Sequence, residues 1–194
     1  MLQGRRVRLE PLRLHDAARL WPAAQATDWR WMSRPVDGPA DLAAWIDARL
    51  DAACAGTALP FVQVRVEDGE AVGCTALQGI DARHRRAAVG NTWLAPTARR
   101  TGVNLEAKLL LLRQAFGPLG LERVEFRTDA ENEASRRSLE ALGATEEGTL
   151  RRHVRYPDGR RGDTVVYSVL REEWGGVEDR IEARLEARLG ARPD

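Results

Sequence analysis

Residues 89–116 read VGNTWLAPTARRTGVNLEAKLLLLRQAF and predict a strand, a loop and a helix in direct succession. Pro96 ends a strand expected over residues 87–94, because proline lacks the N–H donor that a sheet ladder requires. Leucines recur along residues 104–116 as in an amphipathic helix, and the following Gly-Pro-Leu-Gly ends that helix. This unit therefore places the loop Arg99–Asn104 at the start of a strong helix.

The loop Arg99-Arg100-Thr101-Gly102-Val103-Asn104 has the features of an anion site. The first turn of a helix carries free backbone N–H groups and the positive end of the helix dipole. Gly102 lets a phosphate approach the backbone, or lets the chain take a positive φ, while Arg99 and Arg100 add charge. Neither a Walker GK[ST] nor a GxGxxG dinucleotide loop is present. We predict a diphosphate site here, with an ordinary turn before a helix as the alternative.

Outward from this unit, apolar periodicity predicts a mixed α/β layer protein. Residues 27–39 hold two Trp, two Pro and one Gly, so they predict a loop, and Asp68-Gly69 predicts a tight hairpin. The further strands are expected over 5–12, 61–66, 71–80, 123–128, 145–156 and 163–170, and the further helices over 14–24, 41–54, 129–142 and 172–189.

The last predicted helix carries an apolar stripe among Arg and Glu residues, several of which we expect to pair with one another. The stripe consists of Trp174, Val177, Ile181, Leu185 and Leu189. We interpret residues 1–172 as one domain and residues 173–194 as a C-terminal amphipathic helix and tail. The stripe packs either on its own domain or against a second copy in a homodimer.

Composition argues against several kinds of partner. Among the 194 residues 43% are apolar and 30% are charged, and the net charge of +1 creates no overall attraction to nucleic acid or anionic membranes. A nucleic-acid binder that uses the arginines of 83–86 and 151–161 is therefore the weaker alternative. Lys108 is the only lysine among the 30 basic residues, which reflects either thermostability or coding bias.

Cysteine and histidine spacing predicts no metal site, since two Cys form no CxxC and three His show no ligand spacing. No apolar run approaches the roughly 18 residues of a membrane span. The first residues, MLQGRRVRLEPL, lack the apolar core of a signal peptide. We expect a cytoplasmic protein with reduced cysteines.

Two groups of motifs resemble the GNAT superfamily of N-acetyltransferases, in particular its RimJ/RimL-like branch. Arg99, Gly102 and Asn104 occupy the key positions of the family's acyl-CoA loop, Q/R-x-x-G-x-G/A, from which Asn104 departs. The run 92–108 is similar to that branch, as is the run 128–135 with Leu-Gly-Ala at 142–144. The resemblance implies an α/β (α+β) fold with a mostly antiparallel sheet of about seven strands, flanked by helices, and a C-terminal helix.

The resemblance also implies an activity, the direct transfer of an acetyl group from acetyl-CoA to an amine. The backbone N–H of Leu94 would polarise the thioester oxygen, as an oxyanion donor held in place. The loop residues Arg99, Arg100, Thr101, Gly102, Val103 and Asn104 would hold the diphosphate. Asn132 would contact the pantetheine arm, with Ser135 beside it in the same motif. The alternative for Asn132 is a helix N-cap.

Two positions depart from the family's usual proton-transfer groups. Ala88 stands where many relatives place a Glu, and Leu139 where many place a Tyr. Transfer then either proceeds without an acid, since a thiol with a pKa near ~8.5 is a tolerable leaving group, or uses other residues. Ser138 and His153 are the candidates that we name as catalytic. Other groups considered are Asp81, His84, Asp163 and Tyr167. The alternative for His84 is a solvated residue in a charged turn, and for Asp163 a turn or salt-bridge residue.

The acceptor site is expected between the 27–39 loop and the last strand pair. Trp29 and Trp31 could form its wall, and the alternative is that both pack over the core. The acceptor itself stays open between a protein N-terminal alanine or serine, as on a ribosomal protein, and a small-molecule amine. A non-catalytic acyl-CoA-binding module on the same fold is the alternative function, favoured by Ala88 and Leu139.

Overall fold

A computed structural model of the chain describes residues 1–32 and 34–190, without the side chains of residues 189 and 190. The side chain at the predicted stripe position Leu189 is therefore not described, and residues 191–194 of the predicted 173–194 segment lie outside the described residues.

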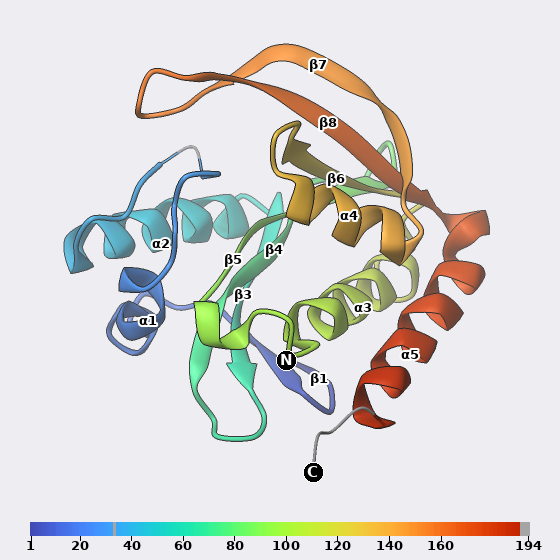
Figure 1. Cartoon of the computed structure of the whole chain (residues 1–194), viewed down its shortest axis with the longest axis horizontal. Helices are drawn as coiled ribbons and strands as arrows, with labels where there is room; N and C mark the ends of the chain where they lie inside the picture. Colours follow the sequence, from blue (N-terminus) through green and yellow to red (C-terminus); the bar gives the residue numbers. More distant parts are fainter. Residues whose placement is uncertain (33, 191–194) are drawn as a thin grey trace.

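One eight-stranded sheet forms the centre of the molecule, with strand order β1-β2-β3-β4-β5-β6-β8-β7 (Figure 1). Only β5 and β6 pair in parallel, and every other neighbouring pair is antiparallel. The predicted mixed, mostly antiparallel fold is therefore confirmed. The strands are Leu2–Gln3 (β1), Val7–Pro11 (β2), Ala58–Arg65 (β3), Ala71–Asp81 (β4), Arg86–Leu94 (β5), Arg123–Asp129 (β6), Thr145–Arg155 (β7) and Arg161–Leu170 (β8).

Helices cover both faces of the sheet. Alternate residues of one strand point to opposite faces, so Val62 packs with the α1–α2 side while its neighbour Phe61 packs with the α3 side. Figure 1 shows α3, α4 and α5 together in front of the sheet. The helices are Asp16–Gln25 (α1), Pro39–Cys54 (α2), Val103–Phe116 (α3), Glu133–Leu142 (α4) and Trp174–Gly190 (α5).

Most element boundaries follow the predictions, and α4 is the main exception. It was expected to begin at Asp129 but begins at Glu133. Asp129 still pairs with Thr164 of β8, and Asn132 caps the helix. The two-residue strand β1 was missed because so short a segment carries no readable alternation.

Helix α5 packs on its own domain, which is the first of the two predicted alternatives. Val177, Ile181 and Leu185 are buried in the core that α3 also lines. The expected pairing among the Arg and Glu residues of this helix is wrong for the described side chains. Instead, Glu178 and Glu182 both pair with Arg113 of α3. No helix in the described part of the chain has the length and apolar character that crossing a bilayer requires.

Candidate functional site

The parallel strands β5 and β6 separate before they end. They pair from Arg86 with Arg123 to Val89 with Phe126, and no pairing joins them beyond that point. The last residues of β6 continue to pair with β8, while Gly90 to Leu94 follow β4 instead. A gap therefore opens between the carboxyl ends of the two strands.

A bulge in β5 accounts for the separation. Opposite Thr75 of β4, strand β5 carries two residues, Asn91 and Thr92, and Asn91 has a φ of 51°. The Asn91 side chain is held on both sides, because its Oδ1 accepts from Arg49 at 3.2 Å and its Nδ2 donates to Gln78 at 2.5 Å. An extra residue bends a strand and increases its twist, which turns β5 away from β6.

The orientation of Leu94 follows from its register. The Ala95 N–H donates to the Val72 oxygen at 2.8 Å, and Leu94 lies opposite Gly73. In an antiparallel ladder the N–H and C=O groups of such a position point away from the partner strand. The Leu94 N–H therefore points away from β4, toward the side on which β6 has separated, and the Leu94 oxygen accepts from Thr27 Oγ1 at 3.4 Å.

The loop from Arg99 to Gly102 begins at the same edge of the sheet and leads into α3. Arg100 and Gly102 both have positive φ, of 65° and 93°, so the chain turns sharply before Val103. Glu106 is the first residue of α3 whose N–H donates to a backbone oxygen, that of Gly102 at 2.9 Å. Among the described residues, the N–H groups of Gly102, Asn104 and Leu105 have no acceptor.

One contact from the N-terminal part of the chain and one local contact fix this loop. Arg6 Nη1 donates to the Thr101 oxygen at 3.0 Å, and Thr101 Oγ1 donates to the Ala98 oxygen at 2.8 Å. Free N–H groups at the start of a helix, held in one conformation, form a site for an anion. Arg99 and Arg100 are exposed beside them.

Asn132 caps α4, which is the alternative considered from sequence. Its Oδ1 accepts from the Ser135 N–H at 3.1 Å. The Asn132 amide Nδ2 has no acceptor in the described part of the chain and can still donate to a ligand. Ser135 is half-buried in the first turn of the same helix. Since α3 and α4 follow the parallel strands β5 and β6, both helices begin at the edge where the gap opens.

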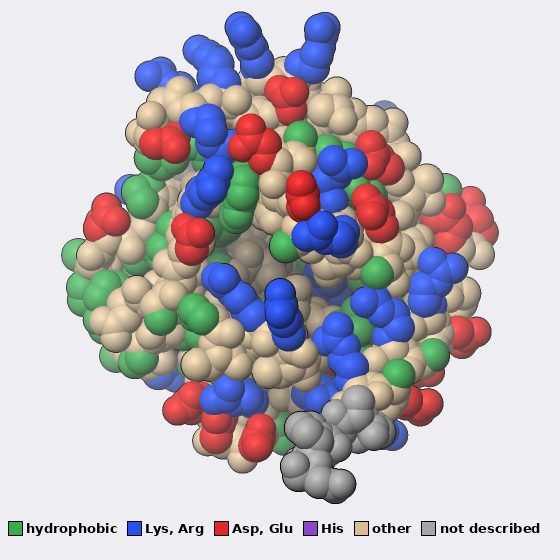
Figure 2. All heavy atoms as spheres, in the orientation of Figure 1, with side chains coloured by type: hydrophobic (Ala, Val, Ile, Leu, Met, Phe, Trp, Pro, Cys, Tyr) green, Lys and Arg blue, Asp and Glu red, His purple; other side chains and the backbone are tan. Residues whose placement is uncertain are grey.

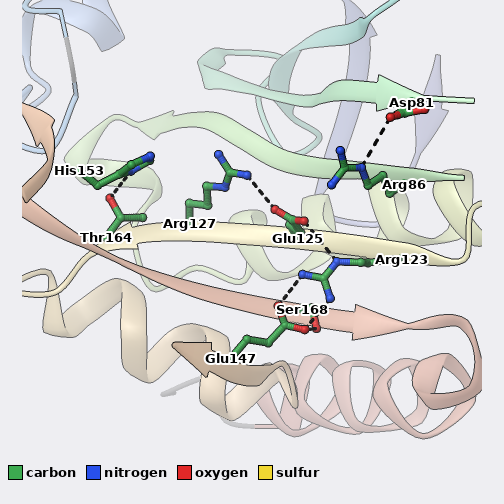
Figure 3. Close-up of polar contacts among 9 residues, drawn as sticks. All are labelled: Asp81, Arg86, Arg123, Glu125, Arg127, Glu147, His153, Thr164 and Ser168. Carbon is green, nitrogen blue, oxygen red and sulfur yellow. Dashed lines mark hydrogen bonds and ion pairs between the residues drawn. The ribbon is translucent and has the colours of Figure 1, made fainter. Parts of the chain in front are cut away.

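Ser138 and His153 lie in separate surroundings and form no common constellation. The Ser138 hydroxyl accepts from Lys108 Nζ at 3.4 Å, so it faces α3. His153 is exposed on β7, with its Nδ1 3.0 Å from Thr164 Oγ1 (Figure 3). Leu139 is buried in the core and can neither donate nor accept a proton.

Three of the other titratable groups considered from sequence have hydrogen-bond partners in the structure, and the side chain of His84 is exposed. Asp81 accepts from the His84 N–H at 2.9 Å, and Asp163 accepts from the Arg152 N–H at 2.6 Å. The buried Tyr167 hydroxyl bonds to Glu146 at 3.0 Å, and burial raises the pKa of that phenol. Asp81 thus has a role in its turn, whereas Asp163 lies within β8 and binds a backbone N–H of β7, which is neither the turn nor the salt bridge weighed from sequence.

A carboxylate that sequence reasoning missed lies directly across from Ala88. Glu125 of β6 is the register partner of Ala88 and is 9% exposed. Figure 3 shows its side chain between Arg123 and Arg127, whose nitrogens lie 3.2 and 3.0 Å from its oxygens. Glu125 and Ala88 both line a cavity of about 340 Å³. The other residues that line it are Gln78, Gly79, Arg86, Ala87 and Arg127. The sequence did indicate the orientation of Glu125. Val124 and Phe126 were expected to face the core, so the alternation of a strand turns Glu125 to the other face.

The two candidate acceptor tryptophans have different environments. Trp29 packs against Trp45 and Trp93, with ring centroids 6.3 and 5.2 Å apart, and its Nε1 donates to the Ala24 oxygen. This supports the packing interpretation for Trp29. Trp31 instead lies under the guanidinium of Arg160, at 5.1 Å from its ring centroid.

Trp31 therefore joins the loop before α2 to the β7–β8 hairpin. Arg160, at the tip of that hairpin, also stacks on Tyr156 at 4.0 Å and pairs with the buried Asp129 at 3.1 Å. Asp129 is the last residue of β6. The expected meeting of the 27–39 loop with the last strand pair thus occurs beside the carboxyl end of β6.

No group of three or more His, Cys, Asp and Glu within the described ranges could hold a metal ion.

Comparison with known proteins adds a family match. The family model described as an acetyltransferase (GNAT) domain matches residues 6–145. YdaF of Bacillus subtilis, whose name proposes ribosomal N-acetyltransferase activity, is 36% identical over 109 residues, which cover 56% of this chain and 58% of YdaF. The chain thus matches somewhat more than half the length of that relative.

Solved structures match over nearly the whole chain. A proposed acetyltransferase from T. thermophilus superposes with a TM-score of 0.83 at 39% identity, covering 95% of this chain and 96% of that one. Mycobacterium smegmatis RimJ in complex with CoA-disulfide superposes with a TM-score of 0.77 at 26% identity, covering 92% and 88%.

Proposed function

Because the chain belongs to the GNAT acetyltransferase family, we propose that it is an acetyl-CoA-dependent N-acetyltransferase that moves an acetyl group directly to a primary amine. One observation carries the proposal. The gap between β5 and β6 opens at the same edge as the free N–H groups that precede and begin α3. An extended thioester with a diphosphate at one end fits such an arrangement, and the RimJ relative was crystallised with a disulfide of CoA.

Each end of the donor has its own contacts in this proposal. The diphosphate accepts hydrogen bonds from the N–H groups of Gly102, Asn104 and Leu105, with Arg99 and Arg100 adding charge. The pantetheine arm lies in the gap, where Asn132 Nδ2 donates to it. Asn104 stands at the position of the family's second Gly/Ala. The proposed contact uses the backbone N–H of Asn104, which has no acceptor among the described residues, and does not involve its side chain.

The reaction needs few side chains. The amine nitrogen attacks the thioester carbonyl, and the Leu94 N–H stabilises the oxygen as it becomes negative. The nitrogen of the tetrahedral intermediate loses a proton, the C–S bond breaks to leave the amide, and the thiolate takes a proton from solvent. A thiol pKa near ~8.5 makes the thiolate a tolerable leaving group, so the absence of proton-transfer groups at Ala88 and Leu139 is compatible with catalysis. Holding the two reactants together supplies much of the rate.

A protein N-terminal amine is the acceptor that the name of YdaF favours, and alanine or serine is the N-terminal residue that we expect. In this proposal a chain end approaches near the contact of Trp31 with Arg160 of the β7–β8 hairpin, and Glu125 places a carboxylate in the cavity that it lines together with Ala88. A small-molecule amine fits the same chemistry. Both acceptors, together with the need for acetyl-CoA, agree with a cytoplasmic protein.

A non-catalytic acyl-CoA-binding module remains the second candidate, favoured by Ala88 and Leu139. Thiol release from acetyl-CoA separates the two, with a panel of peptides that begin with Ala or Ser, peptides blocked at the N-terminus as controls, and small amines. We expect release only with free amines. Tight binding of CoA in calorimetry, without turnover on any member of the panel, would favour the binding module.

Trp31→Ala is expected to raise KM for the amine acceptor by about three- to tenfold, because it removes an aromatic surface that Arg160 covers. KM for acetyl-CoA should stay within twofold. Trp21→Ala, which removes a half-buried tryptophan of α1, serves as the matched control. Equal rises of both KM values in Trp31→Ala would show that Trp31 has no particular relation to the acceptor.

A further inference from the structure

Positive side chains gather along the seam between α3, α4 and α5. Figure 2 shows Lys and Arg side chains over the region where Figure 1 places α3, its preceding loop and α5. Arg180, Arg184 and Arg188 are four residues apart on α5 and so lie on one face. Together with Lys108 of α3 they form what we call the basic seam.

A contact with a neighbouring element fixes the position of each end of the basic seam. Arg188 Nη1 donates to the Arg100 oxygen at 3.4 Å, which brings the end of α5 to the loop before α3. The Arg180 guanidinium packs on Gly143, directly after α4, where an added Cβ would lie 2.9 Å from its Nη1. The seam therefore runs from the proposed diphosphate loop down to the end of α4.

Lys108 is buried in this seam without a counter-ion. It is 7% exposed, its Nζ donates to Ser138 Oγ at 3.4 Å, and no carboxylate among the described residues pairs with it. Burying an ammonium without an anion is unfavourable. Burial accordingly lowers the pKa of Lys108 to about 8, with the charge of Arg184 as a second cause.

No carboxylate among the described residues forms an ion pair with Arg180, Arg184 or Arg188 either. Arg184 Nη1 is buried without a hydrogen-bond partner among the described residues. Two acidic residues of the same helix, Glu178 and Glu182, pair with Arg113 of α3 instead of with these arginines. Several like charges packed together repel one another unless an anion lies among them. The seam thus has the composition of a site for a multiply charged anion.

We propose that the basic seam binds the 3′-phosphate of CoA, with Lys108 and Arg184 as its charged partners and the Ser138 hydroxyl as a further donor. The inference rests on the proposed function, which places the diphosphate at the loop before α3. Lys108 follows Val103 by five residues, about 7.5 Å along the helix axis. In CoA only the ribose and one methylene group separate the diphosphate from the 3′-phosphate. A phosphomonoester carries close to two negative charges, which suits two cations.

Asn104 supports the same placement. It lies four residues before Lys108, and so on the same side of α3. Its Oδ1 is buried without a partner among the described residues. An amide oxygen there can accept from a ribose hydroxyl or an adenine amino group. Under this proposal α5 is part of the coenzyme site rather than only a support for the core.

Calorimetry with CoA and with 3′-dephospho-CoA tests the proposal. The wild-type chain should bind CoA about 10- to 100-fold more tightly, the range expected for charge-assisted hydrogen bonds. Lys108→Met and Arg184→Met should each lose most of that preference, while their affinity for 3′-dephospho-CoA stays within twofold. Arg83→Met removes the same charge from an exposed turn and should keep the full preference.

The outcomes separate this inference from the proposed function. Equal binding of both coenzymes by the wild-type chain, with acetyl transfer intact, would overturn the phosphate site alone. Failure to bind either coenzyme would remove the proposed function. If the variants do not fold, the Tm of the wild-type chain tests the phosphate site instead. Adenosine 3′,5′-bisphosphate should raise Tm more than adenosine 5′-phosphate does. Equal increases in Tm would contradict the phosphate site.

Discussion

Gly102→Val is expected to weaken acetyl-CoA binding by more than about 100-fold. Gly102 has a φ of 93°, and an added Cβ would lie 3.0 Å from Arg6 Cδ. A β-branched residue cannot take that conformation without strain, so the backbone from Thr101 to Asn104 has to move. Each hydrogen bond to a charged group contributes roughly 1.5–3 kcal/mol, and loss of two or three at the diphosphate accounts for the effect. Calorimetric titration with acetyl-CoA measures it.

Backbone strain itself is controlled for by Gly56→Val. Gly56 follows α2 with a φ of 71°, and nothing lies within 4 Å of an added Cβ. Both variants should lose a similar amount of stability, roughly 1–3 kcal/mol. Only Gly102→Val should lose coenzyme affinity. Unchanged affinity in Gly102→Val, with Tm lowered as in Gly56→Val, would remove the loop from the coenzyme site.

Glu106→Ala is expected to cause the largest loss of stability, about 3 to 5 kcal/mol. Glu106 is 6% exposed, and its carboxylate accepts from three consecutive N–H groups, those of Arg5, Arg6 and Val7, at 2.9, 2.7 and 2.8 Å. Removing the acceptor leaves these donors unsatisfied at roughly 1–3 kcal/mol each, with the lower value for those that water reaches. Since small domains are stable by only about 5–15 kcal/mol, the change should be evident in urea unfolding.

Two further variants serve as comparisons for Glu106→Ala. Glu106→Gln keeps one acceptor oxygen and should lose about half as much stability. Glu186→Ala removes an exposed carboxylate from α5 and should change the free energy of unfolding by less than about 0.5 kcal/mol. A loss in Glu106→Ala no larger than in Glu186→Ala would mean that the three hydrogen bonds contribute little to folding.

Local patterns determined much of this protein in advance. Pro96, the leucines of residues 104–116 and Gly102 predicted the strand, loop and helix that the structure contains, because each acts through its own backbone or its near neighbours. Strand periodicity likewise placed seven of the eight strands, and helix spacing placed the five helices. The family resemblance rested on the same local motifs, and the matched family model confirms it.

Tertiary structure decided what depends on residues far apart in the chain. Glu106 reaches N–H groups about a hundred positions away, Glu125 comes to lie opposite Ala88 through the parallel pairing of β5 with β6, and Arg188 meets Arg100. No spacing along the chain reports such contacts, because they arise from the crossover of α3 and the return of α5 along it. The sequence by itself therefore determined the strand, loop and helix around Arg99–Asn104 and predicted an anion site there. Only the folded chain showed that Arg188 of α5 contacts Arg100 of that loop, and that Lys108 and Arg184 come together without a carboxylate partner among the described residues. Packing α5 antiparallel to α3 is what brings these side chains together.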